Sequence, residues 1–488
     1  MDSEGLVLAL DQGTSSTKAA LFSCYGDEVA SASRQTVTSY PDLVGAVGDP
    51  ESWWSALVGC TRELLKDTTV RRRIVGVAIC GFMHTLVPIG EDGSVIASPI
   101  LWSDQRGSGS GAEAIDLTVS SDRQGSPAQV ACRQHLVRLA WENSDLHTSL
   151  AKLLPVKDYL RWRLTGETAT DGYEASGTGL FDPGSGTWDE RALGEVGLST
   201  EAMPKVLGPT AIGGYVSGSA SGETWLRQGT PVIVGSGDWM ATLIGTGAAL
   251  PERACVYLGT AGALGAFDSM HELEQLANPR CYAAATSAGS SLEWLSQLLP
   301  SGNGQLLADW QKLGARSPAG ARGLMFLPHL LGERGGGLRP RARGALLGIT
   351  LAHERPDVIR AVLEGTALWL RQLFEPHLVK LEDALFVASG GGANSPLWVE
   401  IVASMLDREI GLLATSDGGL RGMAILATVG LDIDTDLGGV SRRWTGVQAT
   451  VKPNVDLVAA YAPIARRFAE AEALLSQMEM WDQENKGG

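Results

Sequence analysis

The 488-residue sequence lacks the marks of several common classes of protein. Its six scattered cysteines form no CxxC pair, which excludes a zinc or disulfide framework and favours reduced, mostly buried thiols of a cytoplasmic protein. It has no apolar run of about 18 residues and no signal-peptide pattern, so we expect no membrane span. It also has no excess of positive charge. The 39 basic and 55 acidic residues give a net charge of −16, which argues against a nucleic-acid or anionic-membrane partner.

Two widespread nucleotide-binding signatures are missing as well. No GxxxxGK[ST] sequence occurs, so this is not a P-loop protein. No GxGxxG stands before an acid at the spacing that NAD binding needs. What the sequence does have is glycine, 61 of 488 residues. Since these glycines have no three-residue period, they indicate turns or backbone that approaches a ligand, and not collagen.

The order of apolar runs and turns predicts an α/β chain. Strands are expected at 6–10, 17–23, 29–37 and 74–80. The first three are joined by connections too short for a parallel crossover, so they should pair antiparallel. Between the third and fourth, Asp49 is a good N-cap and Pro50 suits the first helical position, which predicts a helix.

The second half of the chain repeats this logic. Strands are expected at 231–234, 254–258 and 384–388, and helices at 357–375 and from Ser395-Pro396 to Met405. We therefore interpret the chain as two related domains, 1–247 and 248–488. Residues 432–456 are expected to form a loop-rich connection to a last amphipathic helix at 457–480.

The turn from Asp11 to Lys18 is the first candidate for chemistry. Its backbone N–H groups and the hydroxyls of Thr14, Ser15 and Ser16 could surround phosphate oxygens, and Lys18 would add positive charge. Asp11 could hold Mg²⁺ through water. An ordinary polar hairpin turn is the alternative.

A second acid, Asp238, follows a predicted strand and precedes a helical run. In that place it can be a substrate ligand or simply the N-cap of the helix, and the two roles are compatible. Three further segments are weaker candidates by themselves, because strand-to-helix turns and strand-terminal histidines are common. They are Gly259–Gly262, Ser389–Asn394, and Gly81–His84 together with Trp102–Arg106.

Taken in order, the motifs of the chain resemble those of the FGGY family of carbohydrate kinases, and most of all its xylulokinase and gluconokinase branch. They read DQGTSSTK, GFMH, WSDQR, SGTGLFD, GSGD, GTAG, FLPHLLGER and GGGANSPLW, and they run from about Leu6 to Leu431. The resemblance implies two ribonuclease-H-like domains of the actin-like ATPase kind with a cleft between them. The sugar would bind mainly to the N-terminal domain and ATP mainly to the C-terminal domain.

The resemblance also implies roles for single residues. Asp238 would be the catalytic base and Asp11 the acid that organises Mg²⁺. The sugar would be contacted by Met83, His84, Trp102, Asp104, Asp238 and Trp239. ATP would be bound by Thr14, Ser15, Ser16, Lys18, Gly259, Thr260, Gly391, Gly392 and Asn394.

Three departures from the family pattern affect specificity more than reaction class. Phe82 stands where xylulokinases usually have glutamine, which is nearer some gluconokinases. Gly335–Gly337 follow the Gly-Glu-Arg motif before Pro340, where the family usually has a close proline. Trp239 follows the expected base, where small or polar residues are common, and would reshape the sugar pocket.

We therefore expect an ATP-dependent, Mg²⁺-using kinase of an open-chain sugar. D-xylulose is the first choice, and gluconate or another pentulose or polyol is the alternative. A sugar-binding regulator without activity is disfavoured because both acids, Asp11 and Asp238, are retained. An actin-like ATPase would leave Asp238 and the Met83-His84 pair unexplained. Dimers are common in the family, so a homodimer is also compatible with the resemblance.

Overall fold

The computed structural model describes residues 5–42, 45–104, 106, 127–143, 146–270, 279–299, 306–333, 339, 342–415 and 417–485. Gln105 and the Gly335–Gly337 loop, with Arg334 and Pro340, lie outside the described residues. The chain divides into two compact units. The first is Met1–Gly245, Met270–Ala277 and Gly418–Trp444, and the second is Thr246–Ser269, Asn278–Asp417 and Thr445–Gly488. This division differs from a cut at 247/248 chiefly because Gly418–Trp444 groups with the first unit.

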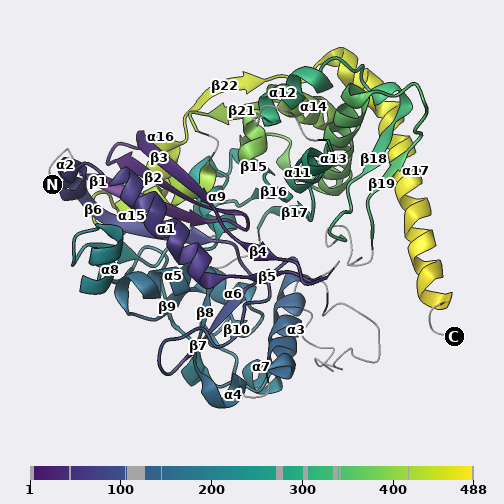
Figure 1. Cartoon of the computed structure of the whole chain (residues 1–488). Helices are drawn as coiled ribbons and strands as arrows, with labels where there is room; N and C mark the ends of the chain where they lie inside the picture. The colour runs from purple at the N-terminus through teal and green to yellow at the C-terminus, as the bar shows by residue number, and fades with distance from the viewer. Residues whose placement is uncertain are drawn as a thin grey trace. The chain divides into compact units, whose positions relative to one another are not determined.

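The first unit contains a six-stranded mixed sheet of order β13-β14-β6-β1-β2-β3. Figure 1 labels four of its strands, β6, β1, β2 and β3. Its strands are β1 Leu6–Gln12, β2 Ser16–Ser23, β3 Glu28–Gln35, β6 Ile74–Gly81, β13 Ile212–Tyr215 and β14 Pro231–Ile233. The expected antiparallel pairing of β1 with β2 and of β2 with β3 is confirmed. Strand β6 pairs parallel with both β1 and β14, so three carboxyl ends meet at one edge of the sheet.

The second unit contains a six-stranded sheet of order β17-β16-β15-β20-β21-β22. Its strands are β15 Arg253–Leu258, β16 Gly262–Ala266, β17 Cys281–Ala285, β20 Leu385–Ser389, β21 Ile410–Leu413 and β22 Val447–Val451. Three consecutive antiparallel strands again precede two parallel neighbours and an antiparallel edge strand. The two sheets therefore share one pairing pattern, as expected for related domains.

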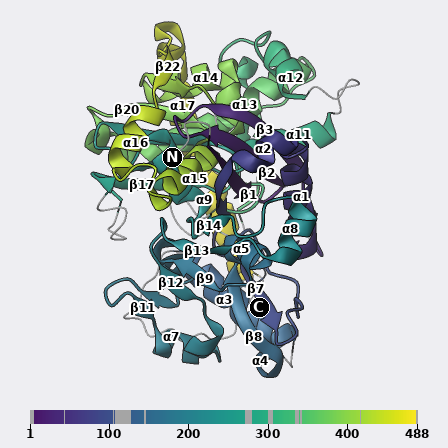
Figure 2. The ribbon, with the colours of Figure 1, turned by 90° about the vertical axis from the view of Figure 1, so that its left-hand side faces the viewer.

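Helix α1, Pro50–Leu64, begins where the sequence predicts it. The Asp49 side chain accepts hydrogen bonds from the backbone N–H groups of Glu51 and Ser52 at 3.0 and 3.3 Å. Its buried face includes Trp53 and Leu57 and packs on β2 and β3. Helix α1 also contacts α8, Gly218–Thr224 (Figure 2).

Helix α15, Gly418–Gly430, lies against the sheet of the first unit although it follows β21 in the chain (Figure 1). It approaches α9, Asp238–Thr246, so closely that a side chain at Gly422 would overlap the backbone oxygen of Ala241. Glycine is required there because no Cβ atom fits. This packing holds α9, and with it Asp238, on the sheet.

Helix α13, Arg355–Leu378, is the central helix of the second unit and confirms the helix predicted at 357–375. A capping box of Glu354 and Asp357 begins it. It contacts α11 Gly289–Leu298, α12 Leu306–Gly314, α14 Pro396–Leu406 and α17 Val455–Asn485. Helix α14 is capped by Ser395, again as predicted.

The expectation of a loop-rich connection at 432–456 is wrong. Helix α16, Leu437–Trp444, and strand β22 occupy much of it. The helix buries Leu437, Val440, Ser441 and Trp444, a single apolar stripe too short to stand out in the sequence. Strand β22 is mostly exposed and pairs at the sheet edge, so it carries little apolar pattern.

The smaller elements complete both units. The short strands are β4 Thr38–Ser39, β5 Val47–Gly48, β7 Leu86–Gly90, β8 Leu150–Pro155, β9 Ala169–Asp171, β10 Phe181–Asp182, β11 Thr187–Trp188, β12 Lys205–Leu207, β18 Met325–Leu327 and β19 Ala345–Leu347. The remaining helices of the first unit are α2 Thr68–Arg73, α3 Pro127–Glu142, α4 Leu146–Ser149, α5 Val156–Thr165, α6 Gly172–Gly177 and α7 Glu190–Glu195. All six cysteines are free, and all but Cys24 are buried. None of the described helices has the length and apolar character that crossing a bilayer requires.

Candidate active site

The carboxyl ends of β1, β6 and β14 place four predicted site residues at one edge of the first sheet. Asp11 lies near the end of β1, Met83 and His84 follow β6, and Asp238 follows β14. Gly81 and Gly237 form a parallel bridge, which aligns the last two segments. Ligands of open α/β sheets bind at such carboxyl ends, so the topology favours a common site.

The turn after β1 closes the antiparallel hairpin of β1 and β2. The N–H group of Gly13 donates to the carbonyl of Ser16 at 2.9 Å, which closes the turn. Thr14, Ser15, Ser16 and Lys18 follow it, and all four are half-buried. Asp11 pairs with Lys18 across the strands, so the two side chains lie on one face of the sheet. The role of these residues in binding ATP stays a prediction.

Asp238 is the first residue of α9. Its Oδ1 atom accepts a hydrogen bond from the N–H group of Trp239 at 2.7 Å. Burial, and then repulsion by the carboxylate of Asp11, raise the pKa of Asp238 to about 7. A carboxylate that protonates near neutral pH is suited to take a proton from a hydroxyl group.

Asp11 fits the part of a Mg²⁺ ligand. The Cys80 thiol donates to the Oδ1 atom of Asp11 at 3.4 Å. The carboxylate of Asp11 is close enough to Asp238 to raise the pKa of that residue. Among the described residues no group of three or more His, Cys, Asp or Glu side chains could hold a metal. Mg²⁺ commonly needs only one or two carboxylates besides water and substrate phosphates, so Asp11 is compatible with it.

Met83 is enclosed by two glycines. A Cβ atom at Gly237 would lie 2.5 Å from its Sδ atom, and a Cβ atom at Gly177 would lie 2.8 Å from its Cε atom. Only 9% of Met83 is exposed. The methionine is therefore closely packed next to the segment of Asp238, and in this conformation it occupies the space that a Cβ atom at either glycine would take.

His84 is held in an unusual conformation. Its φ of 62° lies in the left-handed region, where residues other than glycine are uncommon and often functional. Its Nδ1 atom lies 2.7 Å from the carbonyl oxygen of Gly177 and must donate a proton to it. In the neutral ring, Nε2 is then an acceptor, to which a hydroxyl group could donate.

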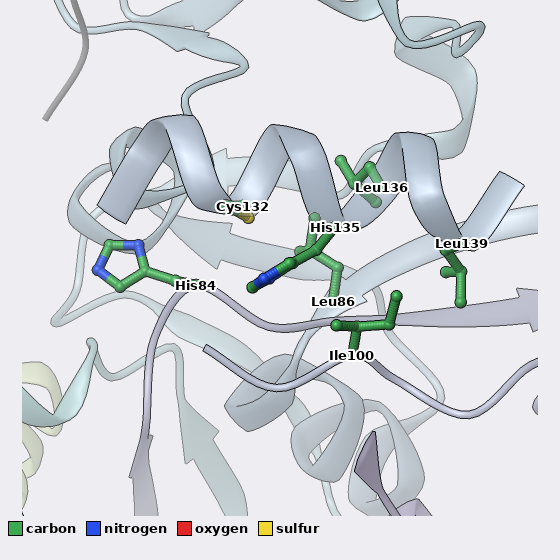
Figure 3. A pocket seen from close by; sticks show the side chains of 7 residues that line it. All are labelled: His84, Leu86, Ile100, Cys132, His135, Leu136 and Leu139. Carbon is green, nitrogen blue, oxygen red and sulfur yellow. The ribbon is translucent and has the colours of Figure 1, made fainter. Parts of the chain in front are cut away.

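A small pocket extends from His84 towards α3 (Figure 3). Figure 3 shows His84 and His135 together with the aliphatic side chains that line it. These are Leu86, Ile100, Leu136 and Leu139, and Cys132 also contributes. Its volume of about 10 Å³ is of the size that one water needs. The pocket is too small for a sugar.

Trp102 forms hydrogen bonds both to the turn after β1 and to the segment that follows His84. Its Nε1 atom donates to the hydroxyl of Thr14 at 3.0 Å, and its N–H group donates to the hydroxyl of Thr85 at 3.0 Å. Asp104 is fully buried and accepts hydrogen bonds from Arg106 and from the N–H group of Ala46. These contacts hold the loop of Asp104 against the segment of Ala46, and the contact of Asp104 with a sugar stays a prediction.

The structure contains a buried charged cluster near Asp238, to which the sequence analysis assigned no role. It includes Lys157, Asp158 and Asp171. Lys157 is 1% exposed, and its Nζ atom lies 2.8 Å from Asp158 and 3.1 Å from Asp171. Asp171 in turn accepts a hydrogen bond from the hydroxyl of Ser236 at 2.7 Å. These contacts connect α5, β9 and the segment just before Asp238, so the cluster supports the position of Asp238.

Glu174 is the member of this cluster that has no cation of its own. It is 2% exposed, and its Oε2 atom has no hydrogen-bond partner among the described residues. Burial raises the pKa of Glu174 well above its usual range. Lys157 opposes the rise, and Asp171, Asp158 and Asp238 add to it. No motif in the sequence marks this residue, because only its packing shows that it is buried.

The second sheet brings the remaining predicted ATP residues together. Strands β15 and β20 are parallel neighbours, and Gly259 and Gly390 follow them. A Cβ atom at Gly390 would lie 2.7 Å from the carbonyl oxygen of Leu258, so the two turns are in contact. The short 3₁₀-helix Gly391–Asn394 begins there and leads into α14. Gly259, Thr260, Gly391, Gly392 and Asn394 thus lie at the carboxyl ends of adjacent strands.

Comparison with known proteins places the chain in a family. It matches the FGGY family of carbohydrate kinases, N-terminal domain, over residues 6–245, and the C-terminal domain of the same family over residues 241–431. A xylulose kinase of Klebsiella pneumoniae is 28% identical over 96% of this chain and 100% of that protein. A xylulose kinase of Staphylococcus epidermidis is 30% identical over 87% and 88%, and a gluconokinase of Bacillus subtilis is 25% identical over 94% and 95%.

Solved structures agree with this placement. The xylulose kinase of Rhodospirillum rubrum has a TM-score of 0.75 and 28% identity, and the alignment covers 97% of this chain and 100% of that one. A gluconate kinase of Lactobacillus acidophilus has the same fold, with a TM-score of 0.77, 22% identity and coverage of 96% and 98%. The predicted α/β fold of the actin-like ATPase kind is confirmed. The chain belongs to the FGGY family of carbohydrate kinases, which transfer phosphate from ATP to small sugars.

Proposed function

We propose that this chain transfers the γ-phosphoryl group of ATP to a hydroxyl group of an open-chain sugar, and that the sugar is D-xylulose. The observation that supports the reaction most is the placement of Asp11, Met83, His84 and Asp238 at adjacent strand ends of one sheet. The substrate rests on relatives of nearly full length that are xylulose kinases.

Asp238 would act as the base. Phosphoryl transfer passes through a loose transition state, so positioning and charge neutralisation supply most of the catalysis. The acceptor hydroxyl would bind to the Asp238 carboxylate and lose its proton late, as the new bond forms. The Trp239 N–H group, which donates to Oδ1, would keep the carboxylate in one orientation.

Mg²⁺ bound near Asp11 would supply positive charge for the phosphate oxygens. Thr14, Ser15 and Ser16 would offer N–H groups and hydroxyls to the same oxygens, and Lys18 would add a cation on the face of Asp11. An acidic chain can therefore bind ATP without a basic surface.

The neutral Nε2 atom of His84 would accept a hydrogen bond from a second sugar hydroxyl. Its partner Gly177 fixes the ring and the tautomer. Met83 would contact the carbon chain of the sugar, and Trp102 and Trp239, both half-buried, would shape the rest of the pocket.

Gluconate is the second candidate, because a gluconokinase of nearly full length is among the relatives. Phe82, which stands where xylulokinases usually have glutamine, gives little support to gluconate as the substrate. Phe82 is 3% exposed and packs edge-to-face on Trp53, with 5.5 Å between the ring centres. It belongs to the core and does not alter the sugar side directly.

Location and assembly complete the proposal. A kinase that uses cellular ATP and keeps six free thiols suits the cytoplasm. A homodimer is compatible with the family resemblance, and its test is the mass of the purified protein in solution.

A coupled assay of ADP release over pentuloses, hexuloses, polyols and aldonates tests the proposed function. We expect sugar-dependent ADP release, with the highest kcat/KM on D-xylulose. Highest activity on gluconate would replace the first candidate by the second. ADP release that no member of the panel stimulates would contradict the proposed function.

A further inference from the structure

The turn at Gly259 and Thr260 rests on a second segment of the same unit, residues 286–290. The N–H group of Ala288 donates to the carbonyl of Thr260 at 2.9 Å, and that of Gly289 donates to the carbonyl of Gly259 at 2.8 Å. A Cβ atom at Gly289 would lie 2.5 Å from the Gly259 oxygen, so the two backbones touch. The position of the turn therefore depends on this segment.

The segment is held in turn by one buried carboxylate. Glu333 is 1% exposed, and its Oε1 atom accepts hydrogen bonds from the N–H group and the hydroxyl of Thr286, at 3.2 and 2.9 Å. Its Oε2 atom accepts a hydrogen bond from Nε1 of Trp369 at 2.6 Å. Both oxygens are thus committed, one to the segment and one to the central helix α13.

A second layer holds Glu333. The Nδ1 atom of His329 lies 3.5 Å from its Oε2 atom, and the Nε2 atom of the same ring lies 2.8 Å from Glu472 of helix α17. Arg339 donates to the other oxygen of Glu472 at 2.7 Å. The positive charges of His329 and Arg339 offset the negative charges of Glu333 and Glu472, which explains how both acids can remain buried.

We propose that Glu333 is a positioning residue for ATP: it fixes residues 286–290, and through them the Gly259–Thr260 turn that presents its backbone and hydroxyl to the phosphates. This inference rests on the proposed function, which assigns that turn to ATP. Glu333 would contact neither substrate. Its effect would pass through Thr286, Ala288 and Gly289.

The substitution Glu333→Gln tests this proposal. The amide keeps one oxygen for Thr286, but its NH₂ group faces the N–H donor of Trp369, so two donors meet. Losing a charged hydrogen bond at this site should weaken ADP binding and raise KM for ATP about tenfold. The KM for the sugar should change less than about twofold, because the sugar site does not depend on this segment.

The double variant Glu333→Gln with Trp369→Phe removes the donor that conflicts with the amide. In the Trp369→Phe background, Glu333→Gln should therefore weaken ADP binding less than it does in the wild type. If the two core changes acted independently, their effects would add, and Glu333→Gln would weaken ADP binding equally in both backgrounds. If Glu333→Gln does not fold, Thr286→Val removes one of the same hydrogen bonds and should weaken ADP binding in the same direction.

Glu364→Gln is the matched control. Glu364 is 3% exposed, lies on α13 of the same unit, and binds Arg360, Tyr461 and the N–H group of Gly320. Its substitution should lower the melting temperature and leave ADP affinity unchanged.

Direct calorimetric titration with ADP keeps this inference separate from the proposed function. If the wild-type chain binds ADP but transfers no phosphate to any sugar, the proposed function fails, and the Glu333 comparison can still be made. If Glu333→Gln binds ADP as the wild type does, or if Glu364→Gln weakens ADP binding equally, the role of Glu333 is contradicted.

Discussion

Gly237 and Met83 are in such close contact that a Cβ atom at Gly237 would lie 2.5 Å from the Met83 sulfur. The same Cβ atom would lie 3.0 Å from Oε2 of Glu174. A side chain at the residue next to the proposed base would therefore have to displace Met83. This contact brings together the segment of the proposed base, the proposed sugar contact and the buried acid Glu174.

We predict that Gly237→Ala impairs sugar binding. The added methyl group must displace Met83 or Glu174, and such overpacking costs about 1–3 kcal/mol. The KM for the sugar should rise about tenfold or more, because 1.4 kcal/mol corresponds to a factor of ten. Steady-state kinetics at saturating ATP measure this. Gly208→Ala is the control, since a Cβ atom there meets nothing within 4 Å. Equal KM values for the two variants would refute the packing argument.

The pH dependence of kcat/KM for the sugar should show an acidic limb near the raised pKa of Asp238, about 7. The base acts when it is deprotonated, so activity should fall as the pH drops through this value. Burial is the larger cause of the shift and persists in the complex, whereas positive charge near Asp11 would offset the smaller cause. A profile that is flat from pH 8 down to about pH 5 would argue against a base with a raised pKa.

Glu174→Gln should stabilise the protein, and increasingly so as the pH rises. The folded-state pKa of Glu174 is raised, so the folded protein holds a proton that the unfolded chain releases, and stability is lost as the pH rises from the unfolded pKa through the folded one. Glutamine carries no such cost. The gain in melting temperature over the wild type should therefore be small near pH 5 and larger near pH 9. A gain that does not depend on pH would show that Glu174 is not strained by burial of its charge.

The strand-and-turn framework could be predicted because local signals determine it. Asp49 and Pro50 begin α1, and the short connections around Gly13 and Tyr25 allow only antiparallel pairing. The order of the motifs then identified the family.

Other features depend on contacts between distant parts of the chain. Glu174 lies just before the SGTGLFD motif and belongs to no motif itself, and only its packing shows that it is buried and that Oε2 has no hydrogen-bond partner among the described residues. Helix α15 joins the first unit because Gly422 can approach Ala241, which no local pattern shows. Asp104 is fully buried and accepts a hydrogen bond from the N–H group of Ala46, 58 residues earlier in the chain, which no local pattern shows.

The most direct test of the account measures ADP release with and without D-xylulose for the wild type and for Asp238→Asn. Asparagine keeps the oxygen that accepts the Trp239 N–H group, so the fold of α9 should persist. We expect sugar-dependent release in the wild type and a loss of at least about a thousandfold in the variant, with ADP affinity unchanged, because only the base is removed. Near-normal turnover by Asp238→Asn would contradict the account.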